Sequence, residues 1–264
     1  MVSLADMWGV GDAYESYVGR WSRLVAAGFL AWLAVPAGRR WLDVGCGTGA
    51  LSQTILNQCD PAEVTGIDTS DGFLGLARQQ VQDNRAKFER ADAALLPFPE
   101  ATFDAVVSAL ALNFLPDRGS AMAEMRRVAR PGGVVAAYVW DYAEGMQMMR
   151  RFWDAANAVD PAARELDEGH RFPLCQRGPL RQLFEASGLG SVEVTGIEVP
   201  TIFRDFDDLW TPFLGGQGPA PGYAVSLDAD RREAIRNRLQ DSLPAERDGS
   251  IRLTARAWAV RGTV

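Results

Sequence analysis

The residues from Arg40 to Ser52 constrain the fold of this chain more than any other stretch. They read R-W-L-D-V-G-C-G-T-G-A-L-S, an apolar run that favours an extended strand, followed by three glycines and the start of a helix. Glycine adopts positive φ without a steric cost and lets a ligand approach the backbone closely. The first turn of a helix leaves backbone N–H groups unpaired and facing such a turn. The stretch therefore predicts a strand, a turn and a helix that bind a nucleotide-like ligand.

The glycine spacing alone leaves two ligand classes open. Gly45, Gly47 and Ala50 also fit the G-x-G-x-x-G/A pattern of enzymes that bind nicotinamide or flavin dinucleotides. Asp43 argues against that reading, because a dinucleotide-binding strand usually carries an apolar residue at this position. A carboxylate there can accept hydrogen bonds from the N–H groups of the turn and lie near a cationic part of the ligand.

Acidic residues also follow the second and third predicted strands. The strand over 62–67 ends at Asp68, and the strand over 86–90 is followed by Asp92. A carboxylate at the position of Asp68 can accept hydrogen bonds from both hydroxyls of a ribose, although NAD would use the same residue type. Residues 68–70 are equally suited to cap a helix. Three acidic strand ends in succession together favour an adenosine-containing ligand.

The order of the predicted elements sets the fold class. Strands and helices alternate with short connections, which is typical of an α/β fold with a doubly wound, mostly parallel sheet. The remaining elements of this half are helices over 14–34, 49–58, 72–82 and 121–130, and strands over 105–108 and 134–140, the last one preceded by a stop at 131–133.

Three motifs together resemble a known family. They are D-V-G-C-G-T-G at 43–49, L-P-F-x-x-x-x-F-D at 96–104 and R-P-G-G-V at 130–134. The first resembles the leading motif of the class I S-adenosylmethionine-dependent methyltransferases, particularly the small-molecule group related to the ubiquinone and menaquinone biosynthesis enzymes. The resemblance extends from about Tyr14 to Trp140. It implies a seven-stranded Rossmann-like sheet and S-adenosylmethionine as the cofactor, with S-adenosylhomocysteine as the product.

The resemblance also implies which residues bind the cofactor. Asp68 corresponds to the ribose-binding position, and Asp92 with the backbone of Ala93 corresponds to the adenine-binding position. Tyr14 and Arg20 precede the turn, where the family often closes a helix over the methionine end of the cofactor, although both residues also suit plain packing. The full predicted set is Tyr14, Arg20, Asp43, Gly45, Cys46, Gly47, Asp68, Thr69, Asp92, Ala93 and Ala109.

The second half of the chain is predicted to hold the methyl acceptor. We expect one domain over 1–264, with a cofactor half at about 14–140 and, over 141–264, cap helices plus the last two strands. The strand over 251–260 is expected to pair antiparallel, and 215–222 is expected to be a Gly/Pro loop. Six apolar residues are candidates to line an acceptor pocket, with the hydrophobic core as the simpler explanation for each: Met149, Trp153, Phe203, Phe206, Trp210 and Phe213.

Methyl transfer by in-line displacement needs mainly positioning, so the catalytic residue stays unknown. His170, the only histidine, and Asp141 are weak candidates for a general base. Asn113 occupies the position where the resembled group often has histidine, so a histidine base is excluded there. We expect no metal site. The remaining alternatives are an NAD-dependent oxidoreductase and a module that binds S-adenosylmethionine without catalysis.

Composition limits the partners of the chain. A formal net charge of -7 over 264 residues argues against non-specific binding along nucleic acid. No run of about 18 uncharged apolar residues occurs, which argues against a membrane span. The three cysteines form neither a zinc pattern nor a disulfide framework, which favours a reducing, cytoplasmic setting. We therefore expect a cytoplasmic monomer or homodimer that acts on a small-molecule methyl acceptor, without nucleic-acid or membrane partners.

Overall fold

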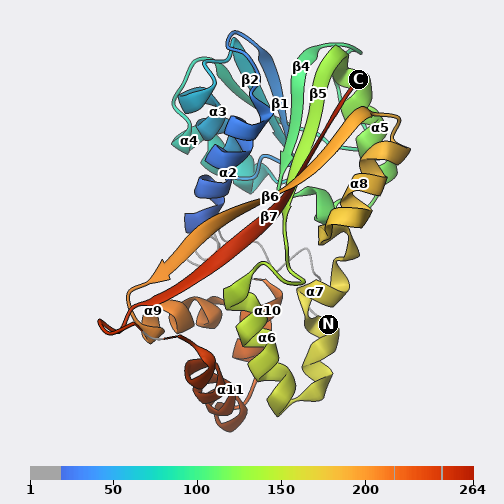
Figure 1. Ribbon diagram of the computed structural model, residues 1–264. Coiled ribbons are helices and arrows are strands. Elements are labelled where there is room, and N and C mark those ends of the chain that lie inside the picture. The colour runs from blue at the N-terminus through green and yellow to red at the C-terminus, as the bar shows by residue number, and fades with distance from the viewer. Residues whose placement is uncertain (1–18, 217, 245) are drawn as a thin grey trace. The chain divides into compact units, whose positions relative to one another are not determined.

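The computed structural model describes residues 19–216, 218–244 and 246–264 (Figure 1). In chain order, the first part contains α2 (Arg20–Leu33), β1 (Arg40–Val44), α3 (Ala50–Gln58), β2 (Glu63–Asp68), α4 (Asp71–Gln80), β3 (Ala86–Arg90), β4 (Phe103–Ala109), η3 (Leu112–Phe114), α5 (Arg118–Val128) and β5 (Ala129–Trp140). The second part contains α6 (Gln147–Val159), η4 (Pro161–Leu166), α7 (Glu168–Arg171), η5 (Pro173–Cys175), α8 (Arg177–Ala186), β6 (Gly190–Phe203), α9 (Phe206–Trp210), η6 (Thr211–Gly215), α10 (Pro219–Ser226), α11 (Ala229–Ser242) and β7 (Ile251–Thr263).

These elements form two compact units. The sheet unit contains 22–139, 174–197 and 257–264, and the helical unit contains the described residues of 19–21, 140–173 and 198–256. The boundary near residue 140 coincides with the predicted change from cofactor half to cap. However, α8 belongs to the sheet unit, because the chain returns there between the cap helices. That the two units behave as one domain stays a prediction.

The sheet has seven strands in the order β3-β2-β1-β4-β5-β7-β6. The pairs β1–β2, β1–β4, β2–β3 and β4–β5 are parallel. Hydrogen bonds join Gly132 N–H to the Val264 carbonyl and Asp141 N–H to the Arg256 carbonyl, so residue numbers rise along β5 as they fall along β7. The predicted α/β fold with a mostly parallel sheet is confirmed, and so is the antiparallel last strand.

The start of β5 differs from the prediction. The R-P-G-G motif at 130–133 was expected to be a stop between helix and strand, whereas β5 already begins at Ala129. Phe103 pairs with Ala129 and Ala105 pairs with Val134, so four residues of β5 bulge opposite one residue of β4. The bulge is stabilised by the end of the chain, because the Val264 N–H donates to the carbonyl of Gly133.

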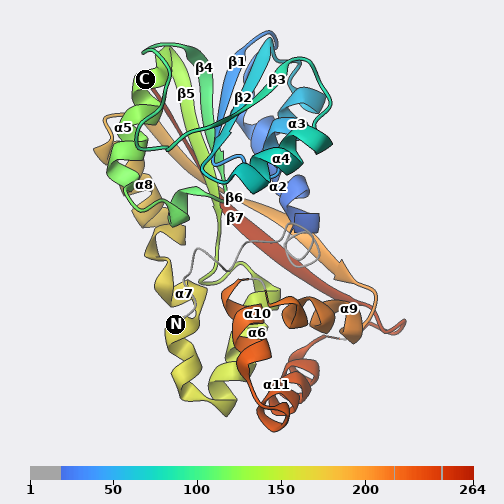
Figure 2. The same ribbon diagram turned by 180° about the vertical axis from the view of Figure 1, so that it is seen from behind.

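Helices cover both faces of the strands in the sheet unit. Figures 1 and 2 show α2, α3 and α4 on one side and α5 and α8 on the other. Phe29 of α2 packs edge-on against Tyr138 of β5, with ring centroids 4.9 Å apart. The central strands are buried on both faces, which explains their nearly continuous apolar sequences.

The helical unit has a core of its own. Phe152 of α6 stacks on Phe213 at 4.4 Å, and Trp153 lies against Tyr223 of α10. The presence of α10 corrects the predicted loop over 215–222. Pro219 begins this helix, where a missing backbone N–H costs nothing, so the Gly/Pro composition was misleading.

Candidate functional site

The glycine turn after β1 uses two of its glycines in different ways. Gly45 has φ +72°, and an added Cβ would lie 2.5 Å from the Cβ of Ala111. Gly45 is therefore required by packing against the loop that follows β4. Gly47 also has positive φ, at +53°, but no atom lies within 4 Å of the place where its Cβ would be. A side chain at Gly47 would fill open space beside the turn, which is the space that a ligand needs.

Asp68 closes the turn. Its Oδ2 accepts a hydrogen bond from the N–H of Gly47 at 3.0 Å, and its Oδ1 accepts one from the N–H of Ser70 at 2.9 Å. Ser70 in turn caps α4 by accepting from the N–H of Phe73. Each carboxylate oxygen has a second acceptor site, so Asp68 keeps capacity for the hydroxyls of a ribose. The residue thus fixes the turn and can still face a ligand.

Asp43 has a different environment from the predicted one. It was expected to accept hydrogen bonds from the turn, but it accepts one from the hydroxyl of Ser52 in α3, at 2.7 Å. The Asp43 side chain is completely buried, and its Oδ1 has no partner among the described residues. The pKa of Asp43 is raised to about 7. Burial is the largest cause and raises the pKa, the hydrogen bonds from Ser52 lower it, and the charge of Asp68 adds a smaller upward effect.

Three further predicted residues lie at the carboxyl ends of β2 and β3. Asp92 is exposed, and its Oδ1 accepts a hydrogen bond from the N–H of Ala94 at 2.9 Å. Ala93 is buried beside it, whereas Thr69 is exposed at the end of β2. β3 pairs parallel with β2, and β2 pairs parallel with β1. Asp68 at the end of β2 and Asp92 just after β3 therefore lie where the carboxyl ends of neighbouring strands meet. This edge is where ligands bind in open α/β sheets.

Cys46 lies within the turn but is not arranged as a nucleophile. Its side chain is buried, and its Sγ contacts the carbonyl of Gly47 at 3.9 Å. Burial raises the pKa of the Cys46 thiol, and the nearby charges of Asp43 and Asp68 raise it further. The thiol is therefore neutral and contributes its size and backbone to the turn.

The end of β4 and the loop after it carry two buried polar groups that were not among the predicted site residues. Ala109 ends β4, and Leu110 follows with φ +56°, an unusual value for leucine. Asn113 is 3% exposed, and its Nδ2 has no partner among the described residues, nor does the buried Oγ of Ser108. From the sequence, Asn113 was noted only as the residue at the family's frequent histidine position, because its burial depends on the fold.

Asp141 and His170 belong to the helical unit and have separate partners. Asp141 is buried and accepts hydrogen bonds from Nε and Nη2 of Arg256, at 2.8 and 2.6 Å. His170 is half-exposed, and its Nε2 accepts from Nε of Arg164 at 2.8 Å. The ion pair gives Asp141 a structural task. A catalytic role for either residue stays a prediction.

Two other predicted cofactor contacts lie at the start of the chain. Tyr14 falls outside the described residues. Arg20 belongs to the helical unit, where its Nη1 donates to Oδ1 of Asp208 at 3.2 Å. Its guanidinium lies over the rings of Trp21 and Phe203.

The six candidate pocket residues contribute mainly to the core of the helical unit. Five are at most 6% exposed, and only Phe206 is half-buried. Trp210 lies 5.9 Å from Phe213 and 6.3 Å from Phe206, measured between ring centroids. These contacts bear out the simpler explanation for most of the set, and an acceptor pocket formed by them stays a prediction.

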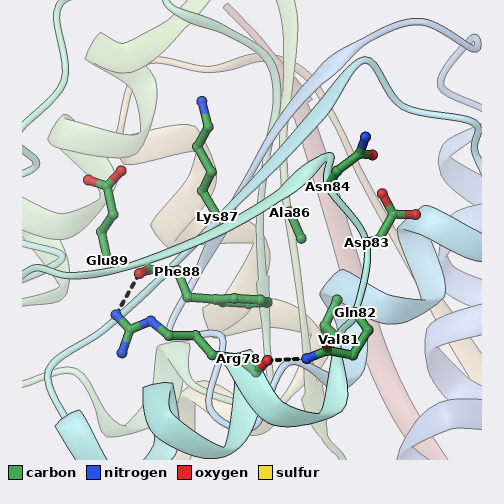
Figure 3. A pocket seen from close by; sticks show the side chains of 9 residues that line it. All are labelled: Arg78, Val81, Gln82, Asp83, Asn84, Ala86, Lys87, Phe88 and Glu89. Atoms are coloured by element: carbon green, nitrogen blue, oxygen red, sulfur yellow. Dashed lines mark hydrogen bonds between the residues drawn. The ribbon is translucent and has the colours of Figure 1, made fainter.

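A cavity of about 660 Å³ lies between α4 and the edge strand β3 (Figure 3). Nη2 of Arg78 donates to the carbonyl of Phe88 at 2.6 Å, which caps an acceptor on the outer edge of β3. Lys87 and Glu89 extend from the same strand. Charged groups of this kind protect an edge strand from pairing with another chain.

Within the part of the chain that the structure describes, neither a metal-binding cluster nor a membrane-spanning helix occurs. No group of three or more His, Cys, Asp or Glu side chains is placed to hold a metal ion there. Within the same ranges, none of the helices combines the length and apolar character needed to cross a membrane.

Residues 42–137 match the family model for a methyltransferase domain. A 2-methyl-6-phytyl-1,4-hydroquinone methyltransferase from Synechocystis sp. is 32% identical over 188 residues, which cover 70% of this chain and 57% of that protein. A ubiquinone/menaquinone biosynthesis C-methyltransferase from Ralstonia pickettii is 34% identical over 179 residues, which cover 62% of this chain and 72% of the relative. This chain thus spans little more than half the length of the first relative and nearly three quarters of the second.

A solved structure supports the fold independently. The phosphoethanolamine N-methyltransferase 2 from Haemonchus contortus, in complex with S-adenosyl-L-methionine, aligns with a TM-score of 0.62 at 16% identity. The alignment covers 100% of this chain and 60% of that chain. At this level of identity, the likeness shows a shared fold alone.

Proposed function

The chain belongs to the S-adenosylmethionine-dependent methyltransferases, and from that premise we propose that it transfers the methyl group of this cofactor to a small, partly apolar acceptor. The observation that carries the proposal is the turn after β1. Gly47 is open to a ligand, and its N–H is held by Asp68, the residue that would bind the ribose.

The residues around the turn fit S-adenosylmethionine chemically. Asp68 and Asp92 offer carboxylate acceptors for ribose hydroxyls and an adenine amino group, at the ends of neighbouring strands. Gly45, Cys46 and Gly47 supply the backbone of the turn, while Ala93, Thr69 and Ala109 complete the proposed surface. When bound, the cofactor supplies an electrophilic methyl group on a sulfonium ion. Asp43, whose Oδ1 has no partner among the described residues, is a further acidic group in the same unit as this turn.

The chain's own contribution to the reaction is chiefly positioning. Holding two reactants in line can lower the barrier by roughly 7–11 kcal/mol without a catalytic side chain. A general base is needed only for an acceptor whose proton is held tightly. We assign no base, because the buried Asp141 is paired with Arg256 and His170 with Arg164.

The nature of the acceptor is a further part of the proposal. Relatives of this chain are named for methylation of a phytyl hydroquinone and for ubiquinone and menaquinone biosynthesis. The helical unit contains many apolar and aromatic side chains, which would suit a ring or an alkyl tail. We propose a small molecule of this kind as the acceptor. A cytoplasmic location and a monomeric or homodimeric state remain predictions.

Calorimetric titration with S-adenosylhomocysteine and with NAD tests the cofactor assignment. We expect S-adenosylhomocysteine to bind and NAD not to bind. Mass spectrometry of the purified protein provides a second test through any adenosine ligand that co-purifies. Formation of S-adenosylhomocysteine with an acceptor panel would exclude a module that only binds. Binding of NAD alone would contradict the proposal.

The role of Asp68 needs a matched substitution, because the residue also holds the turn. D68N keeps one oxygen for hydrogen bonding and loses the charge, whereas D68A removes both acceptors from Gly47 and Ser70. We expect D68N to weaken S-adenosylhomocysteine binding by about tenfold, equivalent to about 1.4 kcal/mol. Asp71, an exposed carboxylate paired with Arg90, provides the control. Equal affinities of D68N and D71N would refute the ribose assignment.

A further inference from the structure

The loop between β3 and β4 begins with a tight turn at the proposed adenine site. The N–H of Leu95 donates to the carbonyl of Asp92 at 3.0 Å, and the N–H of Ala94 donates to the Asp92 carboxylate at 2.9 Å. Before the turn, the N–H of Ala91 donates to the carbonyl of Asp68 at 3.2 Å, which fixes the turn to the end of β2. The Leu95 side chain is 78% exposed and adds little packing, so the other end of the turn depends on a separate anchor.

Two side chains of α5 provide that anchor. Oε2 of Glu124 accepts a hydrogen bond from the N–H of Leu96 at 2.8 Å. Arg127 donates from Nη2 to the carbonyl of Leu96 at 3.1 Å and from Nη1 to the carbonyl of Phe98 at 2.8 Å. Both backbone polar groups of Leu96 are thus held by the same pair of side chains, and Leu96 directly follows the turn.

Glu124 and Arg127 also bind each other. Nε of Arg127 donates to Oε1 of Glu124 at 2.6 Å, and Nη2 donates to Oε2 at 2.7 Å. A bidentate arginine–carboxylate pair fixes the orientation of both groups more strongly than a single contact does. The Glu124 side chain is 18% exposed and that of Arg127 35%, so water competes with the pair only in part. The hydrogen bonds from Arg127 lower the pKa of Glu124, which keeps this carboxylate ionised.

The far end of the loop does not depend on these side chains. The N–H of Ala101 donates to the carbonyl of Arg127 at 3.0 Å, and the N–H of Thr102 donates to the carbonyl of Val128 at 2.8 Å. The acceptors are backbone groups of α5, so a change of side chain at position 127 leaves them in place. Substitution of Arg127 should therefore release the part of the loop next to Asp92 and keep the connection to β4.

We propose that Glu124 and Arg127 are positioning residues for adenine recognition. They fix Leu96, and through it they hold the turn from Asp92 to Leu95 in the geometry that accepts the adenine amino group. This role rests on the proposed binding of S-adenosylmethionine, and all the residues involved lie in the sheet unit. Without the anchor, the Asp92 carboxylate would still be present but would lose its alignment, and hydrogen bonds weaken steeply as they bend.

Selection of the base provides the readout, because a general loss of stability does not change it. S-adenosylhomocysteine is compared with S-inosylhomocysteine, in which a carbonyl oxygen replaces the adenine amino group and the adjacent ring nitrogen carries a hydrogen. We expect the wild type to bind the adenosine compound at least about tenfold more tightly, since a carboxylate accepts from an amino group and repels a carbonyl oxygen. In R127M this preference should fall to about threefold or less by calorimetry.

Matched variants separate positioning from stability. Met122 is fully buried on α5 and supplies none of the hydrogen bonds described above, so M122A leaves a cavity in the same helix. We expect M122A to lower the temperature of unfolding and to keep the wild-type preference. R126M, at an exposed position next to Arg127, should change neither quantity. R127K keeps the charge but lacks the planar set of donors, so its preference should lie between those of wild type and R127M.

A double variant tests whether Arg127 acts through Asp92. The amide in D92N can accept from an amino group or donate to a carbonyl oxygen, so D92N should bind the two compounds within about twofold of each other. Adding R127M to D92N should then change the preference no further, because residues that act through one another are not additive.

Four outcomes would overturn the positioning role. They are equal binding of the two compounds by the wild type, the wild-type preference in R127M, an equal loss of preference in M122A, and a further change when R127M is added to D92N. If R127M does not fold, the wild-type preference in R127K has the same meaning. Wild-type protein that binds neither compound would instead refute the proposed cofactor.

Discussion

Among the residues that the structure describes, each unit of this protein contains one completely buried carboxyl group without an arginine partner, and the two groups resemble each other closely. Asp43 of the sheet unit accepts from the Ser52 hydroxyl, and Glu168 of the helical unit accepts from the indole N–H of Trp153. Each also has one oxygen without a partner among the described residues. Burial is the largest cause in both cases and raises each pKa to about 7.

The charges around the two groups differ. Asp43 is influenced by Asp68, the carboxylate that holds the glycine turn. Glu168 is influenced by Asp167, which raises its pKa, and by Arg150, which lowers it. Burial is thus shared by the two carboxyl groups, but their charged neighbours differ. Asp43 interacts with a carboxylate of the proposed cofactor site, and Glu168 interacts with an ion pair in the helical unit. We expect Asp43 to affect ligand binding and Glu168 to affect stability alone.

The largest effect is expected from removing the cation beside Glu168. Arg150 forms two hydrogen bonds to Asp167, whose side chain is 2% exposed. R150M would leave that buried carboxylate with the Gly169 N–H as a donor but without its guanidinium partner, which costs about 4 kcal/mol of unfolding free energy. Denaturant unfolding measures the loss. The double variant R150M/D167L should recover most of it, and a single variant that unfolds like wild type would contradict the assigned role of the pair.

The next effect is a change in how stability depends on pH. The pKa of Glu168 is raised from 4.5 to about 7 on folding, so unfolding releases a proton between these values. The contribution of Glu168 to the free energy of unfolding is therefore complete below about pH 4.5, decreases as the pH rises, and is lost above about pH 7. E168Q, which cannot ionise, should remove up to about 3 kcal/mol of this decline and be more stable than wild type at pH 8.

A neighbouring substitution provides the control for E168Q. Tyr223 lies against Trp153, and its hydroxyl donates to Asp160 at a long 3.4 Å. Y223F keeps the ring and should change stability by less than about 0.5 kcal/mol, with the pH dependence of wild type. Asp43, whose pKa is also raised to about 7, contributes a similar decrease of stability with rising pH. D43N should therefore remove the part of the decrease that E168Q leaves. If E168Q retained the full decline, Glu168 would not be the titrating group.

The smallest effect is expected in ligand binding through Asp43. S-adenosylmethionine carries a sulfonium charge that S-adenosylhomocysteine lacks, and an ionised carboxylate favours a nearby cation. The preference for S-adenosylmethionine should therefore increase about threefold between pH 6 and pH 8 in the wild type, as Asp43 loses its proton. Calorimetry should show a constant preference in D43N. E168Q should behave as wild type here, and a loss of the pH effect in E168Q would break the distinction between the two units.

Much of the sheet unit could be predicted from sequence, because each element is encoded locally. Apolar runs gave the central parallel strands, and the glycines gave the turn after Val44. The motif at 130–133 was misjudged because its pairing partner, Val264, lies at the other end of the chain. In the helical unit, Pro219 was assigned to a loop because a proline suits a helix start as well as a turn.

The sequence by itself determined the family, the cofactor class and the acidic residues at the strand ends, since these depend on short motifs and on the order of elements. Only the tertiary structure decided that Asp68 holds the turn, that Asp43 is paired with Ser52, and that Nε and Nη2 of Arg20 are buried without an acceptor among the described residues. These facts depend on burial and on distances between segments far apart in the chain. A residue's ionisation and its free hydrogen-bonding capacity follow from those quantities, and no local pattern records them.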